Sequence, residues 1–360
     1  MEYTKDDLAY IWLSSINGLS NRKKHRLMDF FDSPREILEA PLGDEVIGFT
    51  GEEFAKKLIA CRKYNYLDDL LYELDKMRIT AVPFGSRQYP NLLREIVPPP
   101  LCLYCKGNIE LMHTPCLGVV GTRNCTKYGR EVTEKFVADL AVAGMTIVSG
   151  MARGLDGVAH DTALKSGGNT IAVLASGVDV IYPPEHKDLY GRIVERGLVL
   201  SEYLPRTAPQ TYQFPERNRL ISGLSNGVLV TEAGKGSGAL ITLEYALEQN
   251  RDIFIVPGNI TSKASAGSNE ALRYTECALA LNANDILSKY HMPEIDVEEE
   301  SDVKLDVMEE KVMDALYKGE AHFDELLALT GLDVSALNIL LTEMQIKGLI
   351  TKNKGNYYSI

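Results

Sequence analysis

The sequence lacks any run of about 18 or more uncharged apolar residues, so we expect no membrane-spanning helix. Its first residues, from Met1 to Asp7, are polar and charged, which is unlike the start of a secretory signal. The 6 cysteines among the 360 residues do not have the spacing of a disulfide framework. These three absences fit a protein of the reducing cytoplasm.

The sequence is also poor in metal-binding clusters. Cys102 and Cys105 form a C-x-x-C pair, which His113 and Cys116 would complete to a zinc set. The surrounding residues, however, are apolar and typical of an extended strand, on which positions three apart face opposite sides. We therefore interpret these cysteines as small buried hydrophobic residues, and we expect neither a metal nor a cofactor.

An excess of positive charge is missing as well. The chain has 38 Lys and Arg residues against 50 Asp and Glu residues, a formal net charge of −12. This total argues against a broad basic surface that coats a nucleic acid. Residues 291–360 contain 6 basic and 15 acidic residues, whereas residues 115–290 contain 17 and 18. A focused cationic pocket in the central region is therefore compatible with the total.

The N-terminal part of the chain has the apolar spacing of helices. This spacing predicts a small helical domain over residues 1–75, with a hairpin of the helix-turn-helix or helix-hairpin-helix kind. Ser20 is a candidate cap for a helix that we expect to run through Phe31. The basic cluster from Arg22 to Arg26 favours a solvated helix face, and contact with phosphates is the alternative. A further helix is expected to start at Ser33-Pro34.

The middle of the chain changes to short apolar runs that alternate with helical segments. Residues 76–116 are Pro-rich and extended, because Pro98-Pro99-Pro100 excludes a helix there. Six runs that follow are apolar enough for strands buried on both faces. They are Leu117–Val120, Thr146–Ser149, Thr170–Leu174, Leu198–Ser201, Val228–Thr231 and Ile253–Val256. We therefore predict an α/β fold, a Rossmann-like doubly wound parallel sheet, over residues 76–290.

The C-terminal part is predicted to be a separate domain. Residues 291–304 are acidic and aperiodic, as in a flexible linker. Residues 305–360 resume a helical period and end in two short strands around a turn, which is the layout of a winged helix. Its expected recognition helix, Val334 to Lys347, has one basic side chain. Reading of duplex DNA normally needs a basic face, so we expect a role in protein contact or stability instead.

Glycines, hydroxyl groups and arginines follow the strand ends, where open parallel sheets bind ligands. Glycine lets the backbone approach an oxyanion, and helix N-termini and arginines suit phosphate. The candidate phosphate-binding residues from this pattern are Gly121, Thr122, Arg123, Ser149, Gly150, Arg153, Gly154, Arg217, Asn218, Arg219, Ser237 and Gly238. One such loop is a weak signal, but their recurrence at one rim predicts a phosphate-binding site.

Two fingerprints of nucleotide enzymes are absent. G-x-G-x-x-G does not follow the first strand, and the Walker A spacing is missing, which disfavours a NAD enzyme or an ATPase. Asp156 and His160 are four apart on one helical face, and we interpret them as a structural hydrogen-bonded pair. Glu232 ends a strand, and we expect it to accept hydrogen bonds from Arg217 or loop amides. General-acid catalysis by Glu232 is the alternative.

These motifs resemble the DprA/Smf family, the bacterial DNA-processing protein A of natural transformation. The resemblance runs from about Tyr89 to Ile286. It includes Val119-Val-Gly-Thr-Arg123, Ser149-Gly-Met-Ala-Arg-Gly-Leu-Asp156 and Phe214-Pro-x-Arg-Asn-Arg-x-Ile221. The family's Gly-Ser-Arg phosphate motif corresponds to Gly121, Thr122 and Arg123, whereas Gly85-Ser86-Arg87 matches it outside the strand-turn context. The chain departs from the family's pattern at Tyr274–Ala278 and at His186.

The resemblance implies a protein without enzymatic activity. It implies binding and protection of single-stranded DNA, loading of the recombinase RecA onto strands coated by single-strand-binding protein, and a homodimer formed through the α/β domain. Lys187 joins the arginines as a possible phosphate contact, and Tyr182 is a candidate for stacking on a base. The alternative function is hydrolysis of nucleoside monophosphates at the glycosidic bond, by a related nucleotide-binding α/β enzyme with Glu232 as its acid.

Overall fold

The computed structural model describes residues 3–39, 41–62, 65–274, 276–295 and 306–360. The chain divides into two compact units, residues 1–295 and residues 296–360. The predicted helical and α/β domains belong to the same unit, so the expected boundary near residue 75 stays a prediction. Residues 296–304 of the predicted linker lie outside the described residues.

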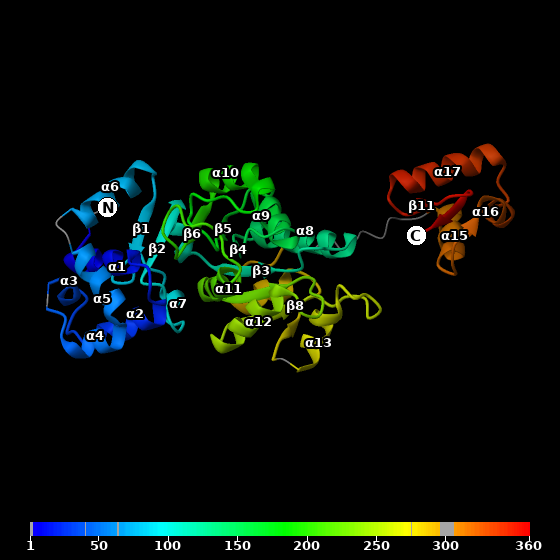
Figure 1. Cartoon of the computed structure of the whole chain (residues 1–360). Coiled ribbons are helices and arrows are strands. Elements are labelled where there is room, and N and C mark those ends of the chain that lie inside the picture. The colour runs from blue at the N-terminus through cyan, green and yellow to red at the C-terminus, as the bar shows by residue number, and fades with distance from the viewer. Residues whose placement is uncertain (1–2, 40, 63–64, 275, 296–305) are drawn as a thin grey trace. The chain divides into compact units, whose positions relative to one another are not determined.

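In the described part of the first unit, nine strands form one sheet in the order β1-β2-β6-β5-β4-β3-β7-β8-β9 (Figure 1). All neighbours from β6 to β9 pair in parallel, and β1 and β2 pair antiparallel at one edge. The strands are β1 (Thr80–Pro83), β2 (Cys102–Gly107), β3 (Cys116–Val120), β4 (Thr146–Ser149), β5 (Thr170–Val173), β6 (Leu198–Ser201), β7 (Gly227–Val230), β8 (Asp252–Ile255) and β9 (Ala278–Leu279).

The six strands predicted from apolar runs are confirmed, and each predicted end lies within one residue of the observed end. The pattern is reliable here because helices cover both faces, so almost every strand residue is buried and apolar. β1 and β2 lie within the segment expected to be extended. β9 has only two residues, both exposed, so it has no apolar run from which it could be predicted.

Helices cover both faces of the sheet, which confirms the doubly wound arrangement (Figure 1). On one face Phe136 and Leu140 pack against Leu117 and Ile147. On the other face Leu220 belongs to the core formed with the opposite sides of the strands. The helices of this part are α7 (Asn91–Arg94), α8 (Lys127–Val142), α9 (Leu155–Lys165), α10 (Lys187–Arg196), α11 (Gln213–Leu224), α12 (Gly238–Glu248), α13 (Ala266–Tyr274) and α14 (Asn284–Leu287).

Cys102 and Cys105 lie on opposite faces of β2, as their spacing predicted. Cys102 packs in the core that includes Ile11, and Cys105 packs in the core that includes Leu103. Both are buried, and burial raises the pKa of each thiol. Within the described ranges no group of three or more His, Cys, Asp or Glu residues is placed to hold a metal ion.

The N-terminal helices are α1 (Lys5–Ser15), α2 (Asn21–Met28), α3 (Glu36–Glu39), α4 (Asp44–Thr50), α5 (Glu52–Cys61) and α6 (Tyr66–Lys76). Ser20 caps α2 by accepting a hydrogen bond from the Lys23 amide. The predicted length of this helix is wrong, because α2 ends at Met28 and Phe30 packs against the ring of Phe49 in the turn that follows. The next helix begins at Glu36, after Ser33-Pro34, and has only four residues.

The second unit has the predicted winged-helix elements. They are α15 (Val307–Leu316), β10 (Ala321–His322), α16 (Phe323–Thr330), α17 (Val334–Ile346), β11 (Thr351–Lys352) and β12 (Tyr357–Ser359). The three strands pair in the order β10-β12-β11. The only basic residue of the expected recognition helix, Lys347, forms an ion pair with Glu309 of α15.

No single helix in the described ranges is long and apolar enough to span a membrane. α16 and α17 satisfy the length and composition criterion only as a pair, and the pair is bent by 108° at its break.

Candidate nucleic-acid interface

A cleft of about 610 Å³ opens at the carboxyl ends of the parallel strands. It lies where the chain reverses direction across the sheet, because β3 continues to β4 on one side and β7 continues to β8 on the other. Such a switch point is where open α/β sheets bind ligands. The loops from Gly121 to Asn124 and from Gly234 to Gly238 form its two sides, and the first turns of α11 and α12 complete it.

Gly154 allows the loop after β4 to reach this cleft. Its φ is +77°, a conformation that strains any residue with a side chain. A Cβ at this position would also collide with the Thr122 carbonyl oxygen and approach the Arg123 Cα to 2.7 Å. The glycine therefore lets the N-terminus of α9 lie directly against the loop that carries Arg123.

Glu232 holds the loop between β3 and α8 in place. Its Oε2 accepts a hydrogen bond from the Thr126 amide at 2.9 Å, and its Oε1 accepts one from the Thr126 hydroxyl at 2.7 Å. Its backbone carbonyl accepts from the Thr122 amide at 2.8 Å. The carboxylate thus accepts from a loop amide, one of the two donors expected from the sequence, and not from Arg217. This buried residue organises the cleft wall.

Arg217 is a structural residue of the cleft floor. Its side chain is buried, and its Nη1 donates to the Gly150 carbonyl at 2.5 Å and to the Val173 carbonyl. Burial lowers the pKa of Arg217 to about 10, so the guanidinium stays charged near neutral pH. The Asp156 carboxylate also lies beside Gly150, close to this guanidinium. A Cβ atom added to Gly150 would lie 2.6 Å from Arg217 Nη2 and 2.7 Å from Asp156 Oδ2, so no side chain fits at this position. Arg217 was predicted to contact phosphate; it lines the cleft, but its Nη1 is already held by these two carbonyls.

The expected hydrogen bond between Asp156 and His160 is absent from the described contacts. His160 Nδ1 instead meets the Thr170 hydroxyl of β5 at 2.6 Å, and Asp156 accepts from the Ala152 amide at 3.3 Å. Burial lowers the pKa of His160 to about 3, so this imidazole is neutral. Burial raises the pKa of Asp156, although the nearby Arg217 opposes the shift. Both residues support the interior beneath the cleft.

Arg123, Phe214 and Tyr182 form a row along the cleft. The Arg123 guanidinium lies 5.7 Å from the centre of the Phe214 ring, and the Phe214 and Tyr182 rings are 5.4 Å apart. Arg123 is exposed, and it has no acidic partner among the described residues. Tyr182 is 41% exposed, so one part of its ring is free to meet a ligand. We call these three residues the cleft row.

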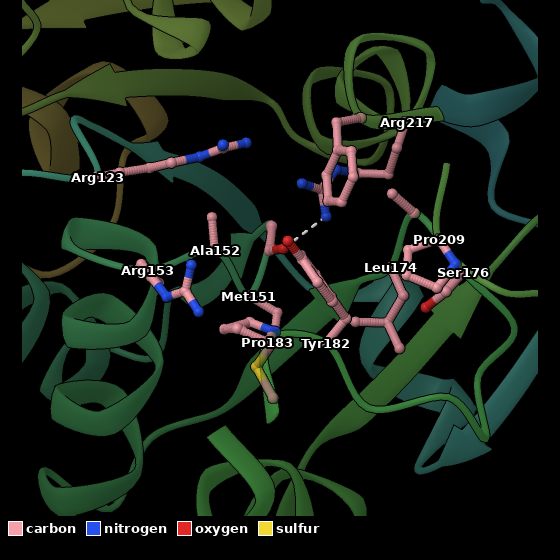
Figure 2. A pocket seen from close by; sticks show the side chains of 13 residues that line it. Arg123, Met151, Ala152, Arg153, Leu174, Ser176, Tyr182, Pro183, Pro209 and Arg217 are labelled. Atoms are coloured by element: carbon pink, nitrogen blue, oxygen red, sulfur yellow. Dashed lines mark hydrogen bonds between the residues drawn. The ribbon is translucent and has the colours of Figure 1, made fainter. Parts of the chain in front are cut away.

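The other cations near the cleft are neutralised or turned away. An adjoining pocket, drawn in Figure 2, shares Arg123, Tyr182 and Phe214 with the cleft. Arg153 reaches this pocket from the same side as Arg123, but it pairs with Glu185, and this contact holds the pKa of that carboxyl at about 2. Lys235 pairs with Glu270 at 2.9 Å. Arg219 is bound to Glu202 and does not line the cleft. Lys187 begins α10 and is exposed, but it too is not among the lining residues.

The predicted hydroxyl donors have mixed positions. Ser149 is buried and donates to the Val119 carbonyl at 2.6 Å, so it stabilises the sheet and not a ligand. Thr122 lines the cleft, and Ser237 lines it while capping α12. Asn218 also lines it, with its Nδ2 donating to the Gly238 carbonyl at 3.2 Å. Gly121 and Gly238 lie on its two sides. The predicted residues that line the cleft are thus Gly121, Thr122, Arg123, Arg217, Asn218, Ser237 and Gly238.

Phe214 is the lining residue that the sequence reasoning missed. It was quoted as part of a motif, but its ring was not assigned a role. The signal was present, because Phe214 stands three residues before Arg217 at the start of a helix, where both point to the same side. Thr126 was missed as well, although its position three residues before Gly129 is that of a helix cap.

Comparison with known proteins identifies the same two parts of the chain. The family described as DNA recombination-mediator protein A matches residues 80–291, and the family described as DprA winged helix domain matches residues 298–356. Similar proteins include the DNA processing protein DprA of Bacillus subtilis, which is 39% identical over 65% of this chain and 78% of its own length. The Smf protein of Synechocystis sp. is 31% identical over 96% of this chain and 97% of its own length.

Two solved structures are similar in fold and sequence. The DNA processing protein A of Streptococcus pneumoniae superposes with a TM-score of 0.68 at 33% identity, over 80% of this chain and 99% of that chain. The DNA processing protein A of Helicobacter pylori, whose structure concerns its mode of single-stranded DNA binding, has a TM-score of 0.55 at 29% identity. That match covers 59% of this chain and 96% of the other.

Proposed function

The chain belongs to the DNA recombination-mediator protein A family, as its motifs predicted, and we propose that it binds single-stranded DNA in the cleft without catalysing a reaction on it. The cleft row is the observation that carries this proposal. It combines one unpaired guanidinium with two adjacent aromatic rings, and single strands are held by this combination of phosphate contact and base stacking.

The backbone around the cleft row supports the same ligand. The amino end of α12 lies at the cleft, with Ser237 and Gly238 among its lining residues. Helix N-termini attract phosphate groups because their amides and dipoles are directed outward. A single strand presents phosphates and unstacked bases together, so it meets both the loop amides and the rings. A free inorganic anion would leave the rings unused.

The cleft offers little to the alternative of a glycosidic hydrolase. Both oxygens of Glu232 accept hydrogen bonds from Thr126, and Asp156, although it lines the cleft, is nearly fully buried and faces Arg217. A general acid needs a carboxyl group within reach of the leaving group. Incubation with purine nucleoside monophosphates tests this alternative, and release of free base that disappears in Glu232→Ala would support it.

We further propose the partners that the family resemblance implies. A mediator that binds single-stranded DNA would deliver it to the recombinase RecA in the presence of single-strand-binding protein. A homodimer would place two clefts on one strand, and the second contact would gain from its high effective concentration. Pull-down of RecA by the purified chain, and its mass in solution, test these two proposals separately.

Comparison of single- and double-stranded oligonucleotides at two salt concentrations tests the proposed function. We expect a gel shift with the single strand and a much weaker shift with the duplex, because paired and stacked bases cannot meet the cleft row. Binding should weaken strongly as salt rises, since phosphate contacts release counterions. Equal binding of both forms would contradict the proposal.

Removal of residues 296–360 should leave the affinity for an oligothymidine nearly unchanged. The winged helix has its own core, and the basic residue of its expected recognition helix is paired with Glu309. Residues 305–360 contain 5 basic and 9 acidic residues, so this unit attracts phosphate weakly. Fluorescence anisotropy of the truncated and full-length chains measures the difference. A loss of tenfold or more, as a rough threshold, would assign a direct role to the winged helix.

A further inference from the structure

The basic cluster of α2 is divided into two sides by the structure. Lys24 and His25 face inward, where Lys24 Nζ donates to the Ser14 carbonyl at 2.8 Å and His25 Nε2 donates to the Pro99 carbonyl at 2.8 Å. Burial lowers the pKa of Lys24 to about 8. Arg22 and Lys23 face solvent, and neither has an acidic partner among the described residues. We call these two exposed residues the α2 basic face.

A network of polar contacts joins α2 to the rim of the sheet that carries the cleft. Asn21, which precedes the α2 basic face, donates to the Pro99 carbonyl at 2.9 Å and to Glu202 Oε2 at 3.4 Å. Glu202 directly follows β6 and therefore lies at the carboxyl ends of the parallel strands. Arg219 of α11 completes the network by bonding Glu202 and the Pro98 carbonyl. The α2 basic face is thus fixed beside the same rim as the cleft.

The distance along this rim suits a short stretch of nucleic acid. β6, which Glu202 follows, is three strands from β3, which leads to Arg123. Because strands are spaced by about 4.8 Å, the ends of these two strands are about 14 Å apart. A strand at the phosphate spacing of a duplex covers this distance in about four nucleotides, and an extended strand needs fewer. Tyr212, which follows β6 and caps the amino end of α11, is 63% exposed and offers a further ring.

The acidic groups at the rim do not neutralise the α2 basic face. The two inward cations of the network, Lys24 and Arg219, face the single carboxylate of Glu202. The neighbouring Glu216 accepts a hydrogen bond from the Tyr203 hydroxyl at 3.1 Å. Neither Glu202 nor Glu216 pairs with Arg22 or Lys23. The positive charges of Arg22 and Lys23 are therefore available to a ligand.

We propose that the α2 basic face is a second phosphate contact for the single strand, and that it holds the segment that leaves the cleft past the amino end of α11. This inference rests on the proposed function and extends it to the N-terminal helices. The N-terminal helices would then contribute to the affinity only for DNA strands long enough to reach them. Short strands would fill the cleft alone, whereas longer strands would reach both contacts.

The test compares labelled oligothymidines of about 3 nucleotides, which is shorter than the span of about four nucleotides along the rim, and of about 20 nucleotides, which exceeds single-strand site sizes. The full-length double variant Arg22→Ala, Lys23→Ala is expected to bind the long probe about tenfold more weakly and the short probe unchanged. For the long probe, the slope of log K against log salt should become shallower by about 1.4, because each phosphate contact of a single strand contributes about 0.7.

The matched control removes two exposed lysines from the same helical region, Lys5→Ala with Lys76→Ala, neither of which has an acidic partner among the described residues. It should bind both probes like the unmodified chain. An equal loss in this control, an equal loss on both probes, or no loss on the long probe would each overturn the proposal. The last outcome would leave the face to another partner, such as an acidic protein. A wrong assignment of the cleft as the binding site gives a different result from a wrong assignment of the α2 basic face. Only in the first case does the Arg123→Ala variant bind both probes like the unmodified chain.

Discussion

Arg123→Ala should nearly abolish binding of a labelled oligothymidine at low salt. Arg123 is exposed, has no acidic partner in the described part of the chain, and lies over the Phe214 ring at 5.7 Å. Hydrogen bonds to charged groups contribute about 1.5–3 kcal/mol, so the affinity should fall by about 10-fold to 100-fold. Anisotropy titration measures this loss.

Two control variants sharpen the interpretation of this result. Arg153→Ala removes the same charge from a residue that is already paired with Glu185, and we expect a smaller effect. Arg123→Lys keeps the charge but loses the planar group that stacks on Phe214 and forks around phosphate, so it should restore only part of the affinity. If Arg123→Ala binds like the unmodified chain, the cleft is not the binding site.

Arg217→Ala should primarily destabilise the fold. The variant leaves the Gly150 and Val173 carbonyls without their buried donor, and it leaves the Asp156 carboxylate without its facing cation. Leaving these buried groups without the nearby cation costs about 3–5 kcal/mol. For a unit of this size we expect Tm to fall by about 5–10 °C, measured by thermal unfolding.

The double variant Arg217→Ala, Asp156→Asn distinguishes a structural role from a ligand contact. If the uncompensated carboxylate causes the instability, the second substitution should recover part of the lost Tm, because the two residues are coupled. DNA affinity measured well below Tm should follow the folded fraction. A variant that keeps its full Tm but loses affinity would instead show that Arg217 binds the ligand directly.

The strands and the position of the cleft were predictable, because both depend on local patterns. Thr146–Ser149 is apolar on both faces since helices cover both sides, and this property is visible in the sequence. The ends of such strands then define one rim by the geometry of a parallel sheet. The winged helix was predictable for the same reason, from the period of residues such as Leu337 and Leu341.

The individual roles of the arginines were not predictable from these patterns. Arg217 and Arg219 are two residues apart on α11, so they point to different sides of the helix. One bonds carbonyls under the cleft and the other bonds Glu202 near α2. The partners are distant in sequence, since 67 residues separate Arg217 from Gly150 and 17 separate Arg219 from Glu202. Sequence spacing identifies the rim but does not reveal which charges are already neutralised.

The three hydrogen bonds from Thr122 and Thr126 to Glu232 have a kinetic consequence. They fix the wall that carries Arg123 during folding, so a strand does not have to order this loop when it arrives. Binding then avoids the cost of immobilising a flexible segment. Encounter should be governed by diffusion and electrostatic attraction, with salt acting on the association rate, and not by a slow rearrangement of the protein. A rigid receiving surface of this kind suits a protein that must capture a transient strand quickly and pass it on.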